Sequence, residues 1–372
     1  VRVALIGQVM ARYRDYAADV VARLDAATGA GLSVSFGDDD EAEIAFRTAP
    51  VDEMNAFAPN ALCFFTPFEG DWRAFLEASR AGRASWSSVD RLEAVTVFIP
   101  ETAAPHEVRA CLEEETAQAL GTGNDLFRFE DSIFNDDAGH LRLTGFDALM
   151  MRVLYDPAIR SGEERETTRE AARAALGRAR AAFGEARRFA TIGDDKHDEI
   201  RSRIFATRSR SEQRKWATRL VTEMRGRDRA DHRLADAYAI RATLAFRNNE
   251  PAAALSDLER AEATLAAILP ADNIRLAAAR ATSAVLLKRE GRARDALAKL
   301  DLAIPVLAAN AYDKHLAQAL RWRAASLAQT GDKAAAAPAA RMALEWGRYV
   351  YGVSSEEVGR WTREFRDLGL LG

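Results

Sequence analysis

The chain has 372 residues, of which 48% are hydrophobic and 29% are charged. This length and hydrophobicity allow two or three domains with buried cores and exclude an intrinsically disordered protein. The net charge of −4 conceals an acidic first part and a basic second part. Residues 1–160 hold 27 acidic and 14 basic residues, and residues 161–372 hold 29 acidic and 38 basic residues. We therefore expect two modules with different surfaces. The basic residues are not interleaved with aromatic ones, so we expect no nucleic-acid partner.

The sequence also bears on membranes and on the cellular compartment. Apolar runs fall short of the roughly 20 residues that span a bilayer, so we expect no membrane span. The chain begins at Val1 inside a strand-like pattern, and we expect that a preceding segment, such as a signal peptide, has been removed. Cys63 and Cys111 are compatible with one disulfide, but two buried thiols would give the same sequence.

The first part of the chain mixes strand and helix patterns in an α+β arrangement. Short apolar or alternating runs predict strands at residues 3–6, 32–36, 43–47, 62–65 and 94–99. Helical periodicity and capping signals predict helices at residues 15–28 and 105–120 and from the cap at Thr144 to Leu154. We expect this domain to end near residue 160.

The second part is almost wholly helical and contains a repeated alanine pattern. Each of three turns, at Asn249, Gly291 and Gly331, has an alanine seven residues before it and alanines five and twelve residues after it. The three alanine triplets are Ala242/Ala254/Ala261, Ala284/Ala296/Ala303 and Ala324/Ala336/Ala343. Small residues in phase allow close helix packing, and this spacing resembles the tetratricopeptide repeat. An ordinary helical bundle is the alternative.

A segment around the end of the predicted helix 105–120 resembles a damaged zinc-peptidase motif. In the pattern H-E-x-x-H-x-x-G-x-x-H, three histidines bind zinc and the glutamate acts as a base. The corresponding residues are Glu114, Glu115, Gln118, Gly121 and Asn124, followed by Asp125. The base position is retained, but oxygen donors that suit zinc poorly replace the imidazoles. The segment therefore resembles a zincin that has lost its zinc ligands.

Four short patterns narrow the resemblance. They are Cys-Leu-x-Glu-Glu-x-x-Gln-x-Leu-Gly from Cys111, Asn124-Asp125, Ser132-Ile-Phe-Asn-Asp136 and Leu154-Tyr-Asp-Pro157. Together they are similar to a bacterial family known as domain of unknown function 2927. The resemblance covers roughly residues 1–160 and implies a zincin-like fold without an established activity. Members of that family usually look exported, so the resemblance also implies a periplasmic or otherwise exported protein.

Three interpretations of the damaged motif remain open. We favour a structural one, in which Glu114 and Gln118 hydrogen-bond to the loop around Asn124 and Asp125, because buried polar groups must be paired. The same oxygen atoms could instead bind calcium or another hard cation. Hydrolysis is the least favoured, because Glu115 without a metal cannot make a strong nucleophile from water.

A second calcium candidate is the acidic run at residues 131–139. It gathers oxygen donors near a glycine, but it lacks both EF-hand spacing and a closing glutamate. We therefore expect a solvated turn there.

These observations predict a non-catalytic binding or scaffold protein without a cofactor. The alternative is a divergent metallopeptidase or a peptidoglycan-active hydrolase that uses Glu115. We expect a protein or peptide partner, possibly acidic, because the repeat phase places cations on or beside a groove: Arg247, Lys288, Arg289 and Arg321. The expected segments are a zincin-like α+β domain (1–160), a helical connector or degenerate repeat (161–230), tetratricopeptide-like repeats (231–350) and a capping helix (351–372).

Overall fold

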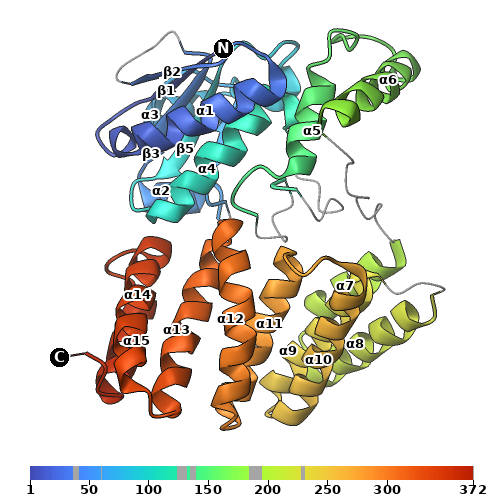
Figure 1. Cartoon of the computed structure of the whole chain (residues 1–372). Helices are drawn as coiled ribbons and strands as arrows, with labels where there is room; N and C mark the ends of the chain where they lie inside the picture. Colours follow the sequence, from blue (N-terminus) through green and yellow to red (C-terminus); the bar gives the residue numbers. More distant parts are fainter. Residues whose placement is uncertain are drawn as a thin grey trace. The chain divides into compact units, whose positions relative to one another are not determined.

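The computed structural model describes the chain except for residues 37–41, 60, 124–131, 135–139, 184–194, 228–230 and 372. The chain divides into two compact units, Val1–Thr191 and Ile192–Gly372. The first contains strands and helices and the second contains only helices in its described part (Figure 1). The predicted order, a unit of strands and helices followed by an all-helical one, is confirmed. The division falls later in the chain than residue 160.

The first unit is built on a five-stranded sheet with the strand order β2-β1-β3-β5-β4. The strands are β1 (Arg2–Leu5), β2 (Ser33–Phe36), β3 (Ile44–Ala49), β4 (Phe64–Thr66) and β5 (Val95–Pro100). The pairs β1–β2, β1–β3 and β3–β5 are parallel, whereas the edge strand β4 runs antiparallel to β5. Each strand overlaps one predicted from the sequence, with ends displaced by at most two residues.

Helices cover both faces of this sheet. They are α1 (Arg14–Thr28), α2 (Val51–Phe57), α3 (Trp72–Arg80), α4 (Pro105–Ala117), α5 (Gly145–Leu154) and α6 (Arg165–Phe183). Helices α1 and α4 pack on the face that carries Val97 of β5 (Figure 1). Helices α2 and α3 pack on the opposite face in an aromatic cluster around Phe98, because adjacent residues of a strand point to opposite faces. Helix α6 packs on α5, so the unit extends beyond residue 160.

The second unit is a succession of helices in which each helix packs on the next. They are α7 (Asp195–Ala206), α8 (Arg210–Arg225), α9 (His232–Arg247), α10 (Pro251–Ile268), α11 (Ile274–Arg289), α12 (Ala293–Ala309), α13 (Asp313–Gln329), α14 (Lys333–Tyr351) and α15 (Glu356–Asp367). Helices α11 and α13 also contact each other. The pairs α9/α10, α11/α12 and α13/α14 follow the alanine repeat, and α7/α8 precede them.

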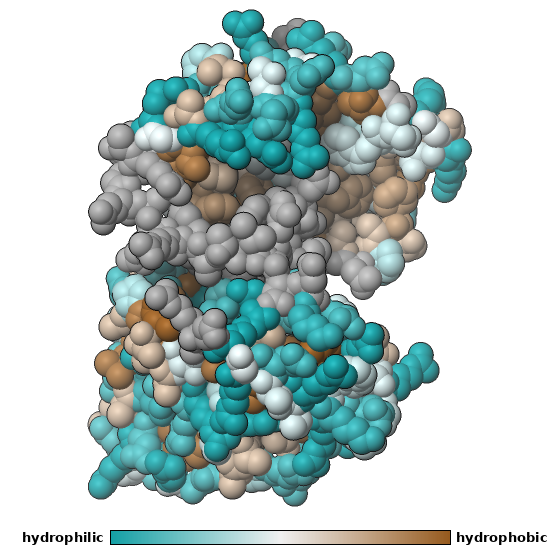
Figure 2. Space-filling view, turned by 90° about the vertical axis from the view of Figure 1, so that its right-hand side faces the viewer, coloured by the Kyte–Doolittle hydropathy of each residue, from teal (hydrophilic) through white to brown (hydrophobic). Residues whose placement is uncertain are grey.

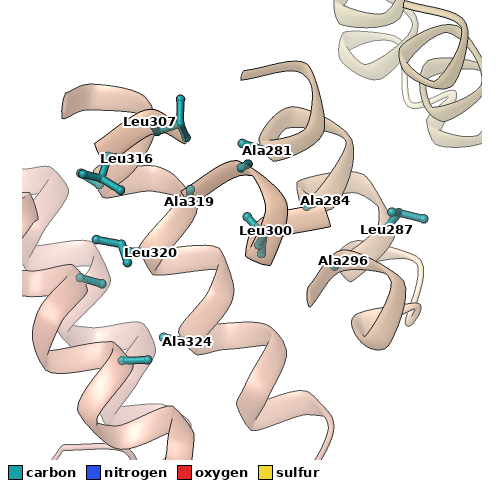
Figure 3. Packing of buried hydrophobic residues seen from close by; sticks show 14 of the residues in the cluster. Ala281, Ala284, Leu287, Ala296, Leu300, Leu307, Leu316, Ala319, Leu320 and Ala324 are labelled. Carbon is teal, nitrogen blue, oxygen red and sulfur yellow. The ribbon is translucent and has the colours of Figure 1, made fainter. Parts of the chain in front are cut away.

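The repeated alanines lie at the helix contacts. All nine are buried, with at most 2% of their surface exposed. Figure 3 shows Ala284 of α11 and Ala296 of α12 where these two helices approach, with Leu300 packed beside them. A single methyl group lets the helices come close, and leucines fill the remaining space. The spacing of the alanines therefore predicted the buried contacts of this unit correctly.

The turn residues of the repeat also adopt the conformation that their types favour. Asn249, Gly291 and Gly331 have positive φ angles of 61°, 81° and 89°. Glycine and asparagine adopt such angles at lower cost than other residues do. At the turn between α12 and α13, Ala311 has a φ of 51°. This turn therefore has the same positive φ angle as the other three, although its residue is neither glycine nor asparagine.

The surface of the helical unit is mostly hydrophilic in the view of Figure 2, where hydrophobic residues show as small separate areas. Its large exposed hydrophobic residues include Phe205, Phe246, Ile268, Leu302, Met342 and Val353. Within the described residues of the chain, no helix combines the length and the hydrophobicity that crossing a membrane requires.

The contact between α14 and α15 depends on a glycine. A Cβ atom added at Gly347 would lie 2.9 Å from Cζ3 of Trp361, whose side chain is fully buried. We expect Gly347→Ala to lower the free energy of unfolding by about 1–3 kcal/mol, because overpacking outweighs the helix propensity of alanine. Urea denaturation followed by circular dichroism measures this change.

Gly359 on α15 is the matched control. A Cβ atom there would meet only Nη1 of Arg363, at 3.6 Å, which is the end of a flexible side chain. We expect Gly359→Ala to raise the free energy of unfolding by up to about 1 kcal/mol. Equal stabilisation by both substitutions would show that the α14–α15 contact does not require a glycine.

Candidate functional site

Helix α4 carries three consecutive glutamates in the segment that resembles the zinc-peptidase motif. Glu113 and Glu115 are buried, whereas Glu114 is only half-buried. Gln118, one turn after Glu114, is buried as well. The side chain of Glu113 is therefore inside the first unit, although Glu113 is not one of the residues that correspond to the zinc-peptidase pattern.

The carboxylate of Glu113 joins α4 to two other segments. It accepts hydrogen bonds from both terminal nitrogens of Arg23 on α1, the Nη2 bond being 2.7 Å long. It also accepts from the Tyr16 hydroxyl at 3.2 Å and from the backbone N–H of Leu143 at 3.0 Å. A buried carboxylate is tolerated only when it is paired in this way. This cluster fixes α1, α4 and the segment before α5 to one another.

The surroundings of Arg23 and Tyr16 raise the pKa values of both side chains. The hydrogen bond to Glu113 raises the pKa of Arg23 above its ordinary value, although burial opposes it. Burial, and then the neighbouring Glu113 charge, raise the pKa of Tyr16. Tyr16 therefore stays protonated and donates its hydrogen bond, and Arg23 stays charged.

Gly121, which corresponds to the glycine of the zinc-peptidase pattern, lies at a bend of the chain. Helix α4 continues into a short π-helical turn, Gln118–Thr122, in which Gly121 has a φ of 118°. A Cβ atom at Gly121 would lie 3.3 Å from Cδ2 of Leu154. The hydroxyl of Tyr155 donates to the carbonyl of Leu120 over 2.9 Å. Asn124 and Asp125, the predicted third ligand position and its neighbour, lie outside the described residues.

Another buried carboxylate, that of Asp147, lies in the first turn of α5. It accepts from the Ser132 hydroxyl at 2.6 Å and from the backbone N–H groups of Ile133 at 3.0 Å and Thr144 at 2.8 Å. Burial raises the pKa of Asp147, and the hydrogen bonds oppose that rise. The Ser132 side chain is thus engaged with α5. The other residues of the second calcium candidate (131 and 135–139) lie outside the described part of the chain.

A disulfide joins Cys63, just before β4, to Cys111 on α4, with 6.1 Å between the two Cα atoms. It closes a loop across a sequence separation of 48 residues. In the chain-entropy model a loop of that length stabilises the folded state by about 4 kcal/mol. The disulfide therefore ties α4 to the edge strand of the sheet.

The structure gives no direct sign of a metal centre in the segments that it describes. Among those residues, no group of three or more His, Cys, Asp or Glu side chains is placed to hold a metal ion. Of the residues that correspond to the zinc-peptidase pattern, the structure describes Glu114, Glu115, Gln118 and Gly121, while Asn124 and Asp125 lie outside the described part.

The helical unit has a hollow of about 340 Å³ on the side formed by α9, α11 and α13. Phe246, Arg289 and Trp322 lie at this hollow. The guanidinium carbon of Arg289 is 4.7 Å from the ring centre of Phe246 and 5.9 Å from that of Trp322. The π electrons of an aromatic ring attract a cation that lies over its face. The three residues come from three different helices, so only the packed unit forms this arrangement.

The four cations that the sequence placed near a groove have different environments. Arg289 lines the hollow, and the Lys288 ammonium lies 5.5 Å from the ring centre of Trp322. Arg321 also contacts Trp322, at 4.7 Å, but it forms ion pairs with Glu364 at 2.8 Å and Glu357 at 3.5 Å on α15.

Arg247 is exposed at the end of α9 and is not one of the residues that line the hollow. The structure therefore brings three of the four predicted cations together around one tryptophan.

Comparison with known proteins characterises the first unit. Residues 1–174 match a family model described as "Protein of unknown function (DUF2927)". The match includes the sheet, helix α4 with its three glutamates, and part of α6, and it supports the resemblance drawn from the short patterns. No curated protein matches the chain. Most of the first unit thus matches this family model, and the helical unit lies outside the match.

The ion pair between Arg23 and Glu113 should contribute to the stability of the first unit. Among the described residues, Arg23→Met would leave the buried Glu113 carboxylate with the Tyr16 hydroxyl and the Leu143 N–H as hydrogen-bond donors. We expect a loss of about 2–4 kcal/mol in the free energy of unfolding, because a buried charge would lose its countercharge. Urea denaturation of the full chain measures the loss.

Asp19→Asn is the control for the same arginine. Asp19 accepts from Nε of Arg23 over 3.1 Å, but its side chain is 61% exposed. We expect this substitution to cost less than about 1 kcal/mol, since exposed ion pairs contribute little. Equal losses from the two substitutions would contradict a special role for Glu113.

Proposed function

We propose that this protein is an exported, non-catalytic binding or scaffold protein that joins a zincin-like domain to a tetratricopeptide-like repeat. The observation that carries the proposal is the hollow beside α9, α11 and α13. There Arg289 contacts two aromatic rings and has no carboxylate partner among the described residues. An unpaired guanidinium beside apolar surface favours a ligand that supplies an anion.

Several features support a zincin-like ancestry for the first unit. Its mixed sheet ends in an antiparallel edge strand, and α4 follows the adjacent strand β5. The motif begins on this helix, and Gly121 bends the chain at the position of the pattern's glycine. The ligands have changed from nitrogen to oxygen donors, which favours loss of zinc over its retention.

The helical unit supports the repeat interpretation through its buried alanines and its succession of helix pairs. Stacked helix pairs expose the side chains of their first helices on one surface, which repeat proteins use for binding. The hollow lies on those first helices. The Cys63–Cys111 disulfide favours an oxidising compartment and so an exported protein.

The alternative function is hydrolysis by a divergent metallopeptidase or peptidoglycan-active enzyme that uses Glu115. Its buried carboxylate on α4 is the feature that favours this alternative. Elemental analysis of the purified chain after dialysis separates the two functions. We expect no stoichiometric zinc, because carboxylate and amide oxygens bind zinc weakly against water. A near-equimolar zinc content that Glu114→Ala abolishes would contradict our proposal.

The binding function is tested with an array of synthetic peptides of acidic, neutral and basic composition. We expect the full chain to bind acidic or carboxylate-bearing peptides, and Arg289→Glu to weaken this binding by about tenfold or more. Arg294→Glu on α12 is the matched control, because Arg294 is exposed and does not line the hollow. Undiminished binding by Arg289→Glu would exclude the hollow as the recognition site.

Arg321 is a poor choice for such a charge reversal. A glutamate at this position would face Glu364 and Glu357 and would disturb the packing of α15. Loss of binding in that variant would therefore not separate recognition from folding.

A further inference from the structure

We infer that the α7–α8 corner, which we define as residues 201–219, binds an anionic lipid surface. This stretch runs from α7 through the intervening turn into α8. It holds seven basic side chains and one acidic one. None of its residues lines the hollow beside α9, α11 and α13, so the inference goes beyond the proposed binding function.

The cations of the α7–α8 corner lie on exposed surface at one end of the succession of helices (Figure 1). Arg208 and Arg210 form no ion pair among the residues that the structure describes. An anionic leaflet attracts exposed cations one by one, since each arginine or lysine near the surface adds to the attraction. Six of the seven cations are exposed: Arg203, Arg208, Arg210, Arg214, Lys215 and Arg219.

Other cations of the corner have carboxylate partners that they can exchange for phosphates. The Lys215 ammonium lies 2.6 Å from a Glu212 oxygen, and Arg214 forms two hydrogen bonds with Glu250, at 2.7 and 3.1 Å. The side chains of Lys215 and Arg214 are 74% and 51% exposed. Exposed ion pairs contribute little to stability, so replacing these carboxylates by lipid phosphates costs the fold little.

A second hollow, of about 620 Å³, lies beside α8 and is polar. Its lining residues are Arg210, Ser211, Arg214, Lys215, Thr218 and Asn248. None of these residues carries a carboxylate, and the hydroxyl and amide groups can donate to phosphate oxygens together with the three cations. Pockets for small molecules measure about 300–1,000 Å³, so this hollow has room for one phospholipid headgroup.

The corner also carries an exposed aromatic ring. Phe205, near the end of α7, is 63% exposed, and it is the one large hydrophobic residue exposed among the described side chains of α7 and α8. The guanidinium carbon of Arg201 lies 5.5 Å from its ring centre. Aromatic rings favour the headgroup level of a bilayer. Insertion of Phe205 at that level would bury apolar surface that water now covers, which favours binding.

Two other kinds of partner fit the corner less well. The core of a protein interface is depleted of charged residues, whereas the corner offers one exposed phenyl ring among cations. Single-stranded nucleic acid stacks its bases on successive aromatic rings. The other ring of the corner, that of Trp216, is half-buried and is contacted by Arg203 at 4.9 Å and Arg219 at 5.3 Å. A lipid surface requires neither an apolar core nor a row of free rings.

The test measures co-sedimentation of the full chain with sucrose-loaded vesicles. Vesicles of phosphatidylcholine alone are compared with vesicles of an equimolar mixture of phosphatidylcholine and phosphatidylglycerol. We expect the anionic vesicles to bind at least about tenfold more tightly. Salt at about 1 M should release the chain, because it shortens the Debye length to about 3 Å. Equal binding to both kinds of vesicle, or binding to neither, would overturn the inference.

Variants assign the binding to the corner. The double substitution Arg208→Gln and Arg210→Gln should weaken binding to anionic vesicles by about 10- to 30-fold, because two cations near the surface are lost. Phe205→Ser should weaken it by about tenfold, because the inserted ring is lost. All three residues are exposed, so circular dichroism should show unchanged helical content.

The matched controls are exposed residues on other helices. The double substitution Arg294→Gln and Arg341→Gln removes the same charge from α12 and α14, and Leu302→Ser removes an apolar side chain from α12. We expect these controls to bind anionic vesicles as the unchanged chain does. If the controls lose as much affinity as the corner variants, the corner is not the binding surface.

Soluble competitors identify the source of the anion. Glycerol phosphate presents the phosphate of a headgroup without an acyl chain, and we expect it not to displace the protein from anionic vesicles at matched phosphate concentration. Displacement would show a site for small anions and would overturn the inference. Binding to a labelled single-stranded oligonucleotide without binding to anionic vesicles would also overturn it. Each of these results would leave the proposed function standing, since Arg289 is unchanged in every variant.

Discussion

The first unit depends on a buried negative charge. Glu113 is wholly inside the fold, and a carboxylate there is stable only with donors around it. Those donors come from α1 and from Leu143, before α5. The requirement to pair one charge therefore positions elements that are far apart in sequence. The same helix α4 is tied to the sheet edge by the disulfide of Cys111.

The helical unit depends on a different constraint, the close approach of helices at alanine positions. The nine repeated alanines are buried at the helix contacts, and a larger side chain at these positions would hold the helices apart. That approach brings Phe246, Arg289 and Trp322 from three helices to one hollow. A cation that contacts aromatic rings loses little conformational freedom when it pairs with a ligand. Packing inside the unit thus determines which side chains meet at the hollow.

The sequence predicted local features better than pairings between distant residues. All five strands and the buried alanines followed from periodicity. Helices α2 and α3 were not predicted, because they are short and are held by the aromatic cluster around Phe98.

Glu113 was missed because three glutamates in a row differ only in which way the helix turns them. No local pattern links that residue to Arg23, 90 positions away. Asp147 shows the intermediate case, since its pairing with Thr144 is a local capping signal but its bonds to Ser132 and Ile133 are not. Arg321 and Arg289 look alike in sequence, and only the tertiary contacts with Glu357 and Glu364 distinguish the paired cation from the available one.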